Sequence, residues 1–189
     1  MESEVLMPPT SAKADVAWVR VFREKFDPWF REARPLIEAH QYQVAFKNYP
    51  FVSFDQPLWS PVKVPLAKGC LGLVSTAAIY RKGVDAPFAD TPEGDPQIIE
   101  LPSDVNLQAL DTSHTHIPQE PIRADGNVAL PLAHLRALVK EGKIAKLARR
   151  FFSILGYRIC ADEVALETAP RIAAAMREDG VTHALVVPV

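Results

Sequence analysis

The chain has 189 residues, a length that suits one domain or one domain with a small arm. Apolar residues make up 48% of it and charged residues 23%, which is the composition of an ordinary globular protein with its own core. With 21 basic and 23 acidic residues, the formal net charge is −2. No overall field draws such a chain to nucleic acid or to an anionic membrane, so we expect neither as a partner.

The cellular compartment is predicted from cysteine usage and from the first residues. Cys70 and Cys160 lie far apart and outside any zinc-ligand spacing, which indicates a reducing compartment. The opening MESEVLMPPTSAKAD lacks the basic stretch and apolar stretch of a signal peptide. No apolar run reaches membrane-spanning length. We therefore expect a cytoplasmic protein.

Residues 1–48 predict a disordered tail followed by a helical arm. Apolar residues recur at helical spacing from Ser11, and Pro28 after Asp27 indicates that a second helical piece begins there. Because apolar helix stripes usually face a core, we favour packing of the arm's aromatic rings on the body over a partner-binding surface. These rings belong to Trp18, Phe22, Phe26, Trp29 and Phe30.

Residues 49–189 alternate predicted strands and helices. Helices are expected from Pro131 to Gly142, over KIAKLARR, and in a segment that ends at Asp179–Gly180. The strand candidates are GCLGLVSTAAIY, PQIIELP, the start of LDTSHTH, FFSILGY and THALVVPV. This alternation indicates an α/β fold with a mostly parallel sheet covered by helices.

Two histidines carry the strongest chemical signal. The chain has no P-loop, no Gly-x-Gly-x-x-Gly, no His-Glu-x-x-His and no nucleophile elbow. On an extended segment, His114 and His116 would share one face, and paired imidazoles suit a metal or an anionic substrate. The alternative is two loop histidines bonded to backbone. Asp125 and Asn127 follow, and strand ends are where open α/β sheets bind ligands.

A second polar cluster follows the first buried strand. Arg81 and Lys82 suit a carboxylate, since arginine binds it with two parallel hydrogen bonds. Ordinary charges on a solvated loop are the alternative, which we favour by default. Each cysteine is expected to be a small core residue instead of a nucleophile. The cluster consists of Ser75, Thr76, Tyr80, Arg81 and Lys82.

The order of these motifs resembles the selenoprotein B family of glycine/sarcosine/betaine/D-proline reductases. It is carried by LVSTAAIYRKG, SHTH, DGNVALPLAHLRALVKEGKI, FFSILGY and TAPRIAAAMREDGVTHALVVPV, over roughly residues 69–189. The resemblance implies a subunit of a multi-subunit reductase that binds a small amino acid or an N-methylated amine. In that family a selenol attacks the carbon next to nitrogen and cleaves the C–N bond reductively. A pyruvoyl group on a separate subunit often takes part.

The resemblance also implies site residues. His114 and His116 are the candidate catalytic residues, with no metal site and no cofactor within the chain. Pro118 stands where many relatives carry an acidic residue. The candidate substrate-binding residues are Ser75, Thr76, Arg81, Ser113, Asp125 and Asn127.

Relatives continue beyond the strand that matches ALVVPV into a redox motif with selenocysteine or cysteine. Because selenocysteine uses a codon normally read as stop, the expectation is that the redox residue follows Val189. A parallel strand normally needs helices on both faces, and LVVPV has no helix after it. If the chain continues in this way, we expect an oxidoreductase subunit with a thiol or disulfide as redox partner. The alternatives are a His-dependent or metal-dependent enzyme of another class and a non-catalytic binding subunit.

Overall fold

The computed structural model describes residues 17–53 and 60–189, so the predicted tail lies outside the described residues. The chain divides into two compact units, with the boundary between Asp55 and Gln56. Among the helices of the described residues, none combines the length and the apolar content needed to cross a membrane.

The amino-terminal unit is built on one long helix, α1 (Ala17–Glu38), followed by α2 (Tyr42–Ala45) and the 3₁₀ turn η1 (Phe46–Asn48). The predicted break at Pro28 is wrong, because α1 runs through Pro28 and Pro35. A helical proline removes one backbone donor, and the buried face that continues on both sides of Pro28 outweighs that loss. That face consists of Phe22, Phe26, Trp29, Ala33 and Ile37.

One indole holds the short helix α2 against α1. Trp29 Nε1 donates a hydrogen bond of 2.9 Å to Ala45 O. The Trp29 ring also meets the Tyr49 ring edge-on, with 4.9 Å between the centroids, and the Phe46 ring at 5.5 Å. The aromatic residues of the arm therefore contact one another within this unit.

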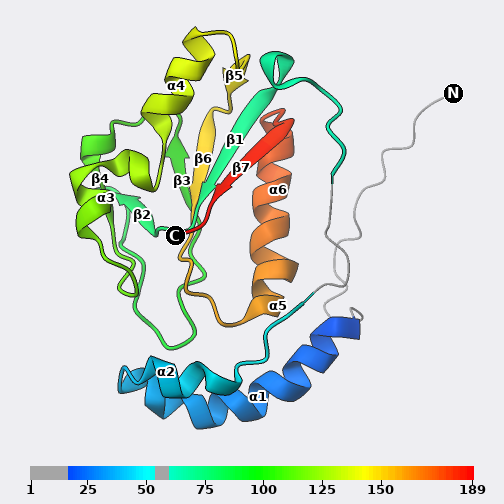
Figure 1. Ribbon diagram of the computed structural model, residues 1–189, viewed down its shortest axis with the longest axis vertical. Helices are drawn as coiled ribbons and strands as arrows, with labels where there is room; N and C mark the ends of the chain where they lie inside the picture. Colours follow the sequence, from blue (N-terminus) through cyan, green and yellow to red (C-terminus); the bar gives the residue numbers. More distant parts are fainter. Residues whose placement is uncertain (1–16, 54–59) are drawn as a thin grey trace, which may run out of the picture. The chain divides into compact units, whose positions relative to one another are not determined.

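The carboxy-terminal unit is centred on β1 (Cys70–Ser75), in which every residue is buried. It pairs in parallel with β5 (Lys146–Leu147), β6 (Arg150–Ser153) and β7 (His183–Val187). β3 (Ile99–Pro102) adds an antiparallel edge next to β6. Figure 1 shows β7 on the opposite side of β1 from β5 and β6. The predicted α/β class with a mostly parallel sheet is confirmed.

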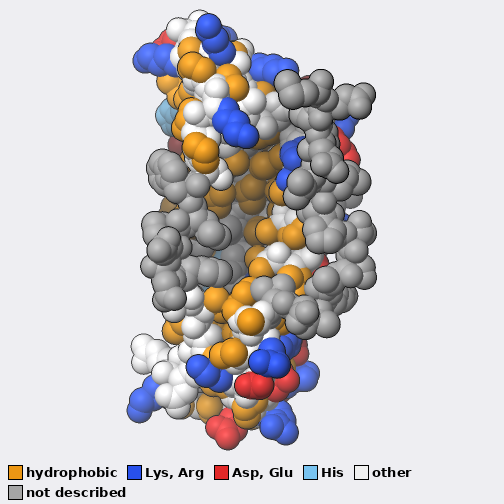
Figure 2. All heavy atoms as spheres, turned by 90° about the vertical axis from the view of Figure 1, so that its right-hand side faces the viewer, with side chains coloured by type: hydrophobic (Ala, Val, Ile, Leu, Met, Phe, Trp, Pro, Cys, Tyr) orange, Lys and Arg blue, Asp and Glu red, His pale blue; other side chains and the backbone are white. Residues whose placement is uncertain are grey.

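The predicted helix over KIAKLARR is wrong, because this segment forms β5 and the start of β6. Its backbone hydrogen-bonds to β1: Ala148 N–H donates to Leu71 O at 2.8 Å. Pairing with a central strand overrides a weak helical preference. The lysines of this run are exposed, and Figure 2 shows basic side chains gathered at the end of the unit where β1 begins. Phe151 and Phe152, which follow this run, are buried.

Two layers cover the sheet (Figure 1). On one face lies α6 (Ala169–Glu178), after α5 (Ala161–Glu163) and the π-helical turn η5 (Val164–Thr168). On the other lie α4 (Leu132–Lys140) and the antiparallel pair β2 (Ile79–Arg81) and β4 (Leu110–Thr112). The shorter elements are the 3₁₀ turns η2 (Leu66–Lys68), η3 (Leu107–Ala109) and η4 (Gly126–Val128), and α3 (Glu120–Ala124).

Alternate residues of β1 serve the two faces, as the strand period requires. Val74 packs with Ile172 and Met176 of α6. Leu71 and Leu73 belong to the larger core, together with residues of α4 and β2. The helices predicted at 131–142 and before Asp179–Gly180 are therefore confirmed, and both complete the covering of the sheet.

Candidate functional site

The carboxyl end of β1 is fixed by two buried serines. Ser75 Oγ accepts a 3.3 Å hydrogen bond from Ala77 N–H, and Ser153 Oγ accepts one of 2.7 Å from Ile79 N–H. Between them the backbone turns sharply, with Ala78 at φ 51°. Ser75 and Ser153 are both 0% exposed. The hydroxyl of Ser75, a predicted substrate-binding residue, thus stabilises the turn that follows the strand.

Thr76 joins the ends of three parallel strands. Its N–H donates to the carbonyl oxygen of Val187, the last residue of β7, at 3.1 Å, and its own carbonyl accepts from Gly156 N–H after β6 at 2.7 Å. Thr76 Oγ1 accepts a 2.9 Å hydrogen bond from Val189 N–H. A Cβ at Gly156 would stand 3.0 Å from both Thr76 oxygens, so this close approach favours glycine. Open α/β sheets bind ligands at this edge.

The segment from Ser113 to His116 packs beside this turn. Ser113 N–H donates to Ala78 O at 3.2 Å, and Ser113 Oγ accepts from Phe88 N–H at 2.9 Å. Residues 115 and 116 form a turn, so the extended geometry predicted for the His-x-His pair is not present. The two imidazoles nevertheless lie together, with 5.9 Å between centroids and an interplanar angle of 80°.

His114 is held as a neutral imidazole. It is 3% exposed, and its Nδ1 lies 3.3 Å from the backbone N of His116 as hydrogen-bond acceptor. An accepting Nδ1 assigns the ring proton to Nε2. Burial, and then the charge of a protonated His116, lower the pKa of His114. His114 therefore offers an Nε2–H donor and carries no charge at neutral pH.

His116 has different surroundings. Its ring stacks on Tyr157 with 3.9 Å between centroids and 18° between planes. Its Nε2 lies 3.6 Å from Oδ1 of the half-exposed Asp90. Tyr157 OH donates a 3.0 Å hydrogen bond to Pro92 O, which joins it to the loop that carries Asp90. The two histidines are thus distinguished: one is buried and neutral, and the other lies beside a carboxylate.

Gly94 allows the loop with Asp90 to lie against Tyr157. It has φ 80°, and an added Cβ would overlap the carbonyl oxygen of Tyr157. The same Cβ would stand 3.1 Å from Cδ of Arg158. Only glycine combines this backbone with this approach. The contact between Asp90 and His116 therefore depends on one glycine in a loop.

Arg81, a predicted substrate-binding residue, has an internal partner. Its Nε and Nη2 meet Asp85 Oδ2 and Oδ1 at 2.8 and 2.6 Å. These hydrogen bonds from Arg81 lower the pKa of Asp85. The two-pronged carboxylate contact expected of Arg81 is thus made within the chain.

Asp125 and Asn127 form a cap before α4. Asp125 Oδ1 accepts from both the backbone N–H and the side-chain Nδ2 of Asn127, at 2.9 and 2.8 Å. Asn127 Oδ1 accepts a 3.0 Å hydrogen bond from Ala133 N–H in the first turn of α4. The bonds from Asn127 lower the pKa of Asp125. Both residues thus have a structural task.

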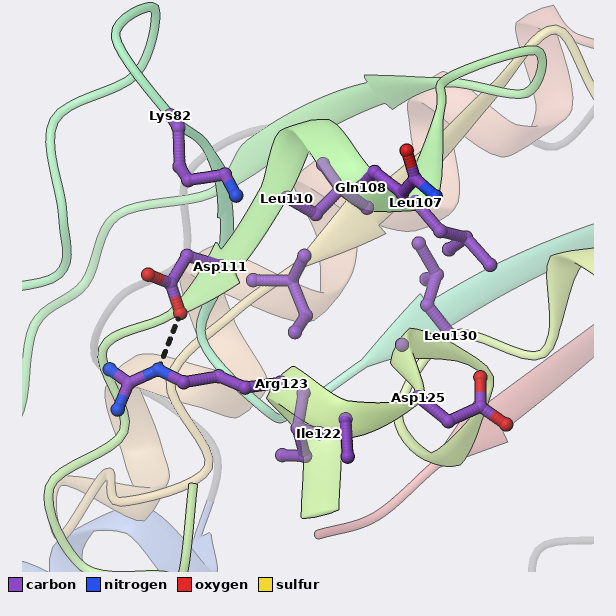
Figure 3. Close-up of a pocket in the computed structure, with 12 residues that line it drawn as sticks. Lys82, Leu107, Gln108, Leu110, Asp111, Ile122, Arg123, Asp125 and Leu130 are labelled. Carbon is purple, nitrogen blue, oxygen red and sulfur yellow. Dashed lines mark hydrogen bonds and ion pairs between the residues drawn. The ribbon is translucent and has the colours of Figure 1, made fainter. Parts of the chain in front are cut away.

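A cavity of about 410 Å³ lies between β2, β4, α3 and η4. Of the predicted catalytic and substrate-binding residues only Asp125 lines it, together with Lys82 of the second polar cluster, so the structure separates Asp125 from the histidines. Figure 3 shows Lys82 and the Asp111–Arg123 ion pair at one end and Asp125 at the other. The side chains of Leu107, Leu110, Ile122 and Leu130 lie between these ends.

Sequence reasoning missed Asp90, Tyr157 and Arg158. Asp90 lies in a polar Gly/Pro-rich loop where no motif marks it as a site residue. Tyr157 is the last residue of the FFSILGY motif, so the motif could have identified it. Arg158 Nη2 contacts Glu163 Oε2 at 2.8 Å, and the side chain is 7% exposed. Its Nε and Nη1 have no hydrogen-bond partner in the described parts of the chain.

The fold and this geometry define an α/β protein with two unlike histidines beside the carboxyl edge of a mostly parallel sheet. Within residues 17–53 and 60–189, no three His, Cys, Asp or Glu side chains converge as a metal-binding set.

Comparison with known proteins identifies the family. Residues 97–188 match the family of glycine/sarcosine/betaine reductase selenoprotein B. The D-proline reductase subunit gamma of Acetoanaerobium sticklandii is 30% identical over 129 residues, which cover 68% of this chain and 52% of the relative. The chain thus spans about half the length of this curated relative. No solved structure matches it. The chain belongs to the selenoprotein B family of these reductases.

Proposed function

We propose that this chain is the substrate-binding part of a reductase subunit. The reaction is reductive cleavage of a C–N bond in a small amino acid or N-methylated amine, by a selenol or thiol. The observation that carries the proposal is the pair His114 and His116, with Asp90 and Tyr157, packed beside the turn that follows β1. Other reductase subunits are the proposed partners.

The two histidines suit different parts of this reaction. When a nucleophile forms its bond to carbon, the electron pair of the C–N bond leaves with nitrogen, which must take up a proton. His116, with the Asp90 carboxylate at 3.6 Å, is the proposed proton donor. Neutral His114 is the proposed hydrogen-bond donor that orients the substrate through Nε2–H.

Arg158 is the proposed partner of a substrate carboxylate. Its side chain is 7% exposed, and two of its guanidinium nitrogens lack a hydrogen-bond partner among the described residues. A buried guanidinium with unmet donors is costly, and an anion would satisfy them. Arg81 is less suited, because both prongs of its guanidinium already contact Asp85.

The nucleophile is proposed to be a selenocysteine or cysteine on the carboxyl side of Val189, with a pyruvoyl group on a partner subunit. Cys70 begins β1, about 16 Å from the end of that strand at 3.3 Å per residue. Burial also raises the pKa of its thiol, which disfavours the reactive thiolate. Val189 N–H already bonds to Thr76 Oγ1, so a residue just beyond it would lie near the site.

The selenocysteine part is tested in the gene. An in-frame TGA after the Val189 codon, followed by further coding sequence, supports it. A TAA codon directly after the Val189 codon would contradict the proposal that the nucleophile is a selenocysteine.

An anaerobic reductase assay tests the function. The protein, together with its reductase partners, is supplied with glycine, sarcosine, betaine or D-proline and with dithiothreitol as reductant. We expect substrate loss coupled to dithiothreitol oxidation, and a loss of about 100-fold or more in His116→Gln, which lacks the proton donor. His134→Gln, at an exposed position on α4, is the matched control. Equal activity of the two variants would contradict the assignment.

A further inference from the structure

The cavity between β2, β4, α3 and η4 has the form of a second ligand site, independent of the histidines. At about 410 Å³ it falls in the size range of small-molecule pockets. It lies wholly within the carboxy-terminal unit and is lined from β2, η3, β4, α3 and η4 of that unit. Its lining combines an apolar floor with a few charged groups at the ends, as such sites usually do.

The floor of the cavity determines the body of the ligand. Ile79, Ile122 and Leu130 are core residues, exposed by 5% or less. Leu107 and Leu110 pack against the same core and are partly exposed. In Figure 3 the labelled side chains of Leu110, Ile122 and Leu130 lie between the charged ends. An occupant therefore gains most by laying a short hydrocarbon chain on this floor, since each buried CH₂ contributes about 0.8 kcal/mol.

The charges at one end determine the head group. Arg123 Nε meets Asp111 Oδ1 at 2.9 Å, so these two charges offset each other. The Lys82 ammonium has no ion pair among the described residues, and the Lys82 backbone is fixed by its 2.9 Å hydrogen bond to Ala109 O. The end formed by Lys82, Arg123 and Asp111 therefore has a formal charge of about +1. A singly charged anion fits this balance better than a phosphate dianion, which the Asp111 carboxylate would repel.

We infer that this cavity binds a small aliphatic monocarboxylate, with its carboxylate on Lys82 and its chain on the floor formed by Leu107, Leu110, Ile122 and Leu130. Asp125 at the far end disfavours the reversed orientation, because its own carboxylate is kept ionised by the hydrogen bonds from Asn127. The orientation is thus set by opposite charges at the two ends.

The test is a titration of the full chain, labelled with ¹⁵N, with hexanoate, hexanol and hexylammonium, followed by two-dimensional NMR. We expect hexanoate to shift the amide signals of β4 and α3 at the lowest concentration, hexanol to shift them more weakly, and hexylammonium least.

Two variants separate the head group from the floor. Lys82→Gln is expected to weaken hexanoate binding about tenfold or more, the size of a lost charge-assisted hydrogen bond, and to leave hexanol unchanged. Leu107→Ala weakens both ligands. Lys68→Gln, at an exposed lysine in η2, is the control and should bind as the unaltered chain does.

An absence of shifts in β4 and α3 with hexanoate would overturn the inference. Equal hexanoate affinity in Lys82→Gln and Lys68→Gln would also overturn it.

Discussion

Gly94 and Gly83 provide a matched pair that tests how the loop with Asp90 is held. Both have left-handed backbones, at φ 80° and 73°. An added Cβ at Gly83 meets nothing within 4 Å, whereas at Gly94 it overlaps Tyr157 O and stands 3.1 Å from Arg158 Cδ. Gly83→Ala therefore carries only backbone strain, about 1 kcal/mol. Gly94→Ala carries the same strain and a further 1–3 kcal/mol or so from overpacking.

The assay is urea unfolding of the two variants and the unaltered chain, followed by circular dichroism. We expect Gly94→Ala to lower the free energy of unfolding by about 2–4 kcal/mol and Gly83→Ala by about 1 kcal/mol. If the loop instead moves away from Tyr157, the Gly94→Ala loss is smaller but the ring signals of His116 change, because the contact with Asp90 is broken. Equal stability of the two variants, together with unchanged His116 signals, would refute the packing described here.

Two further predictions concern pH and charge. The pKa of His114 is lowered in the folded chain, so the unfolded state takes up the proton first as the pH falls below about 6.5. The free energy of unfolding should then fall by up to about 1.4 kcal/mol per pH unit, until His114 is protonated in the folded chain as well. Unfolding of His114→Gln at pH 7.5 and 5.5 should show a smaller fall than that of His134→Gln, and an equal fall would contradict the assignment. Asp179, with its side chain 1% exposed, meets both Arg150 and Arg149. Arg150→Gln should cost about 2–4 kcal/mol in urea unfolding, and Arg149→Gln, at a side chain 71% exposed, about 0.5 kcal/mol; a reversed order would exclude this arrangement.

The sheet and its covering helices were predictable where local patterns are strong. The strand at Cys70–Ser75 is a short apolar run after a glycine, and the helix at Leu132–Lys140 has a clear apolar stripe closed by Gly142. The segment with Lys146 and Leu147 was not predictable, because it becomes a strand only through pairing with β1, which lies more than 70 residues earlier. Long-range pairing leaves no local signal.

The site divides in the same way. The His-x-His spacing predicted that His114 and His116 lie close together, and their rings are neighbours in the structure. Their different environments depend on Asp90 and Tyr157, which lie on two other loops and reach His116 only through tertiary contacts. Asp125 and Asn127 illustrate the opposite case. An Asp-x-Asn stretch shortly before a helix is a capping signal that the sequence already contained.

A small amino acid or amine is proposed to bind at His114 and His116. The most direct measurement is a titration of the ring ¹H and ¹⁵N signals of the histidines with glycine, sarcosine, betaine and D-proline. We expect at least one of the four to shift the signals of His114 and His116 and to leave the signals of His134 unchanged. In Arg158→Gln we expect these shifts to be lost, because Arg158 is the proposed partner of the ligand carboxylate. If none of the four shifts either ring, or if His134 shifts equally, the claim is contradicted.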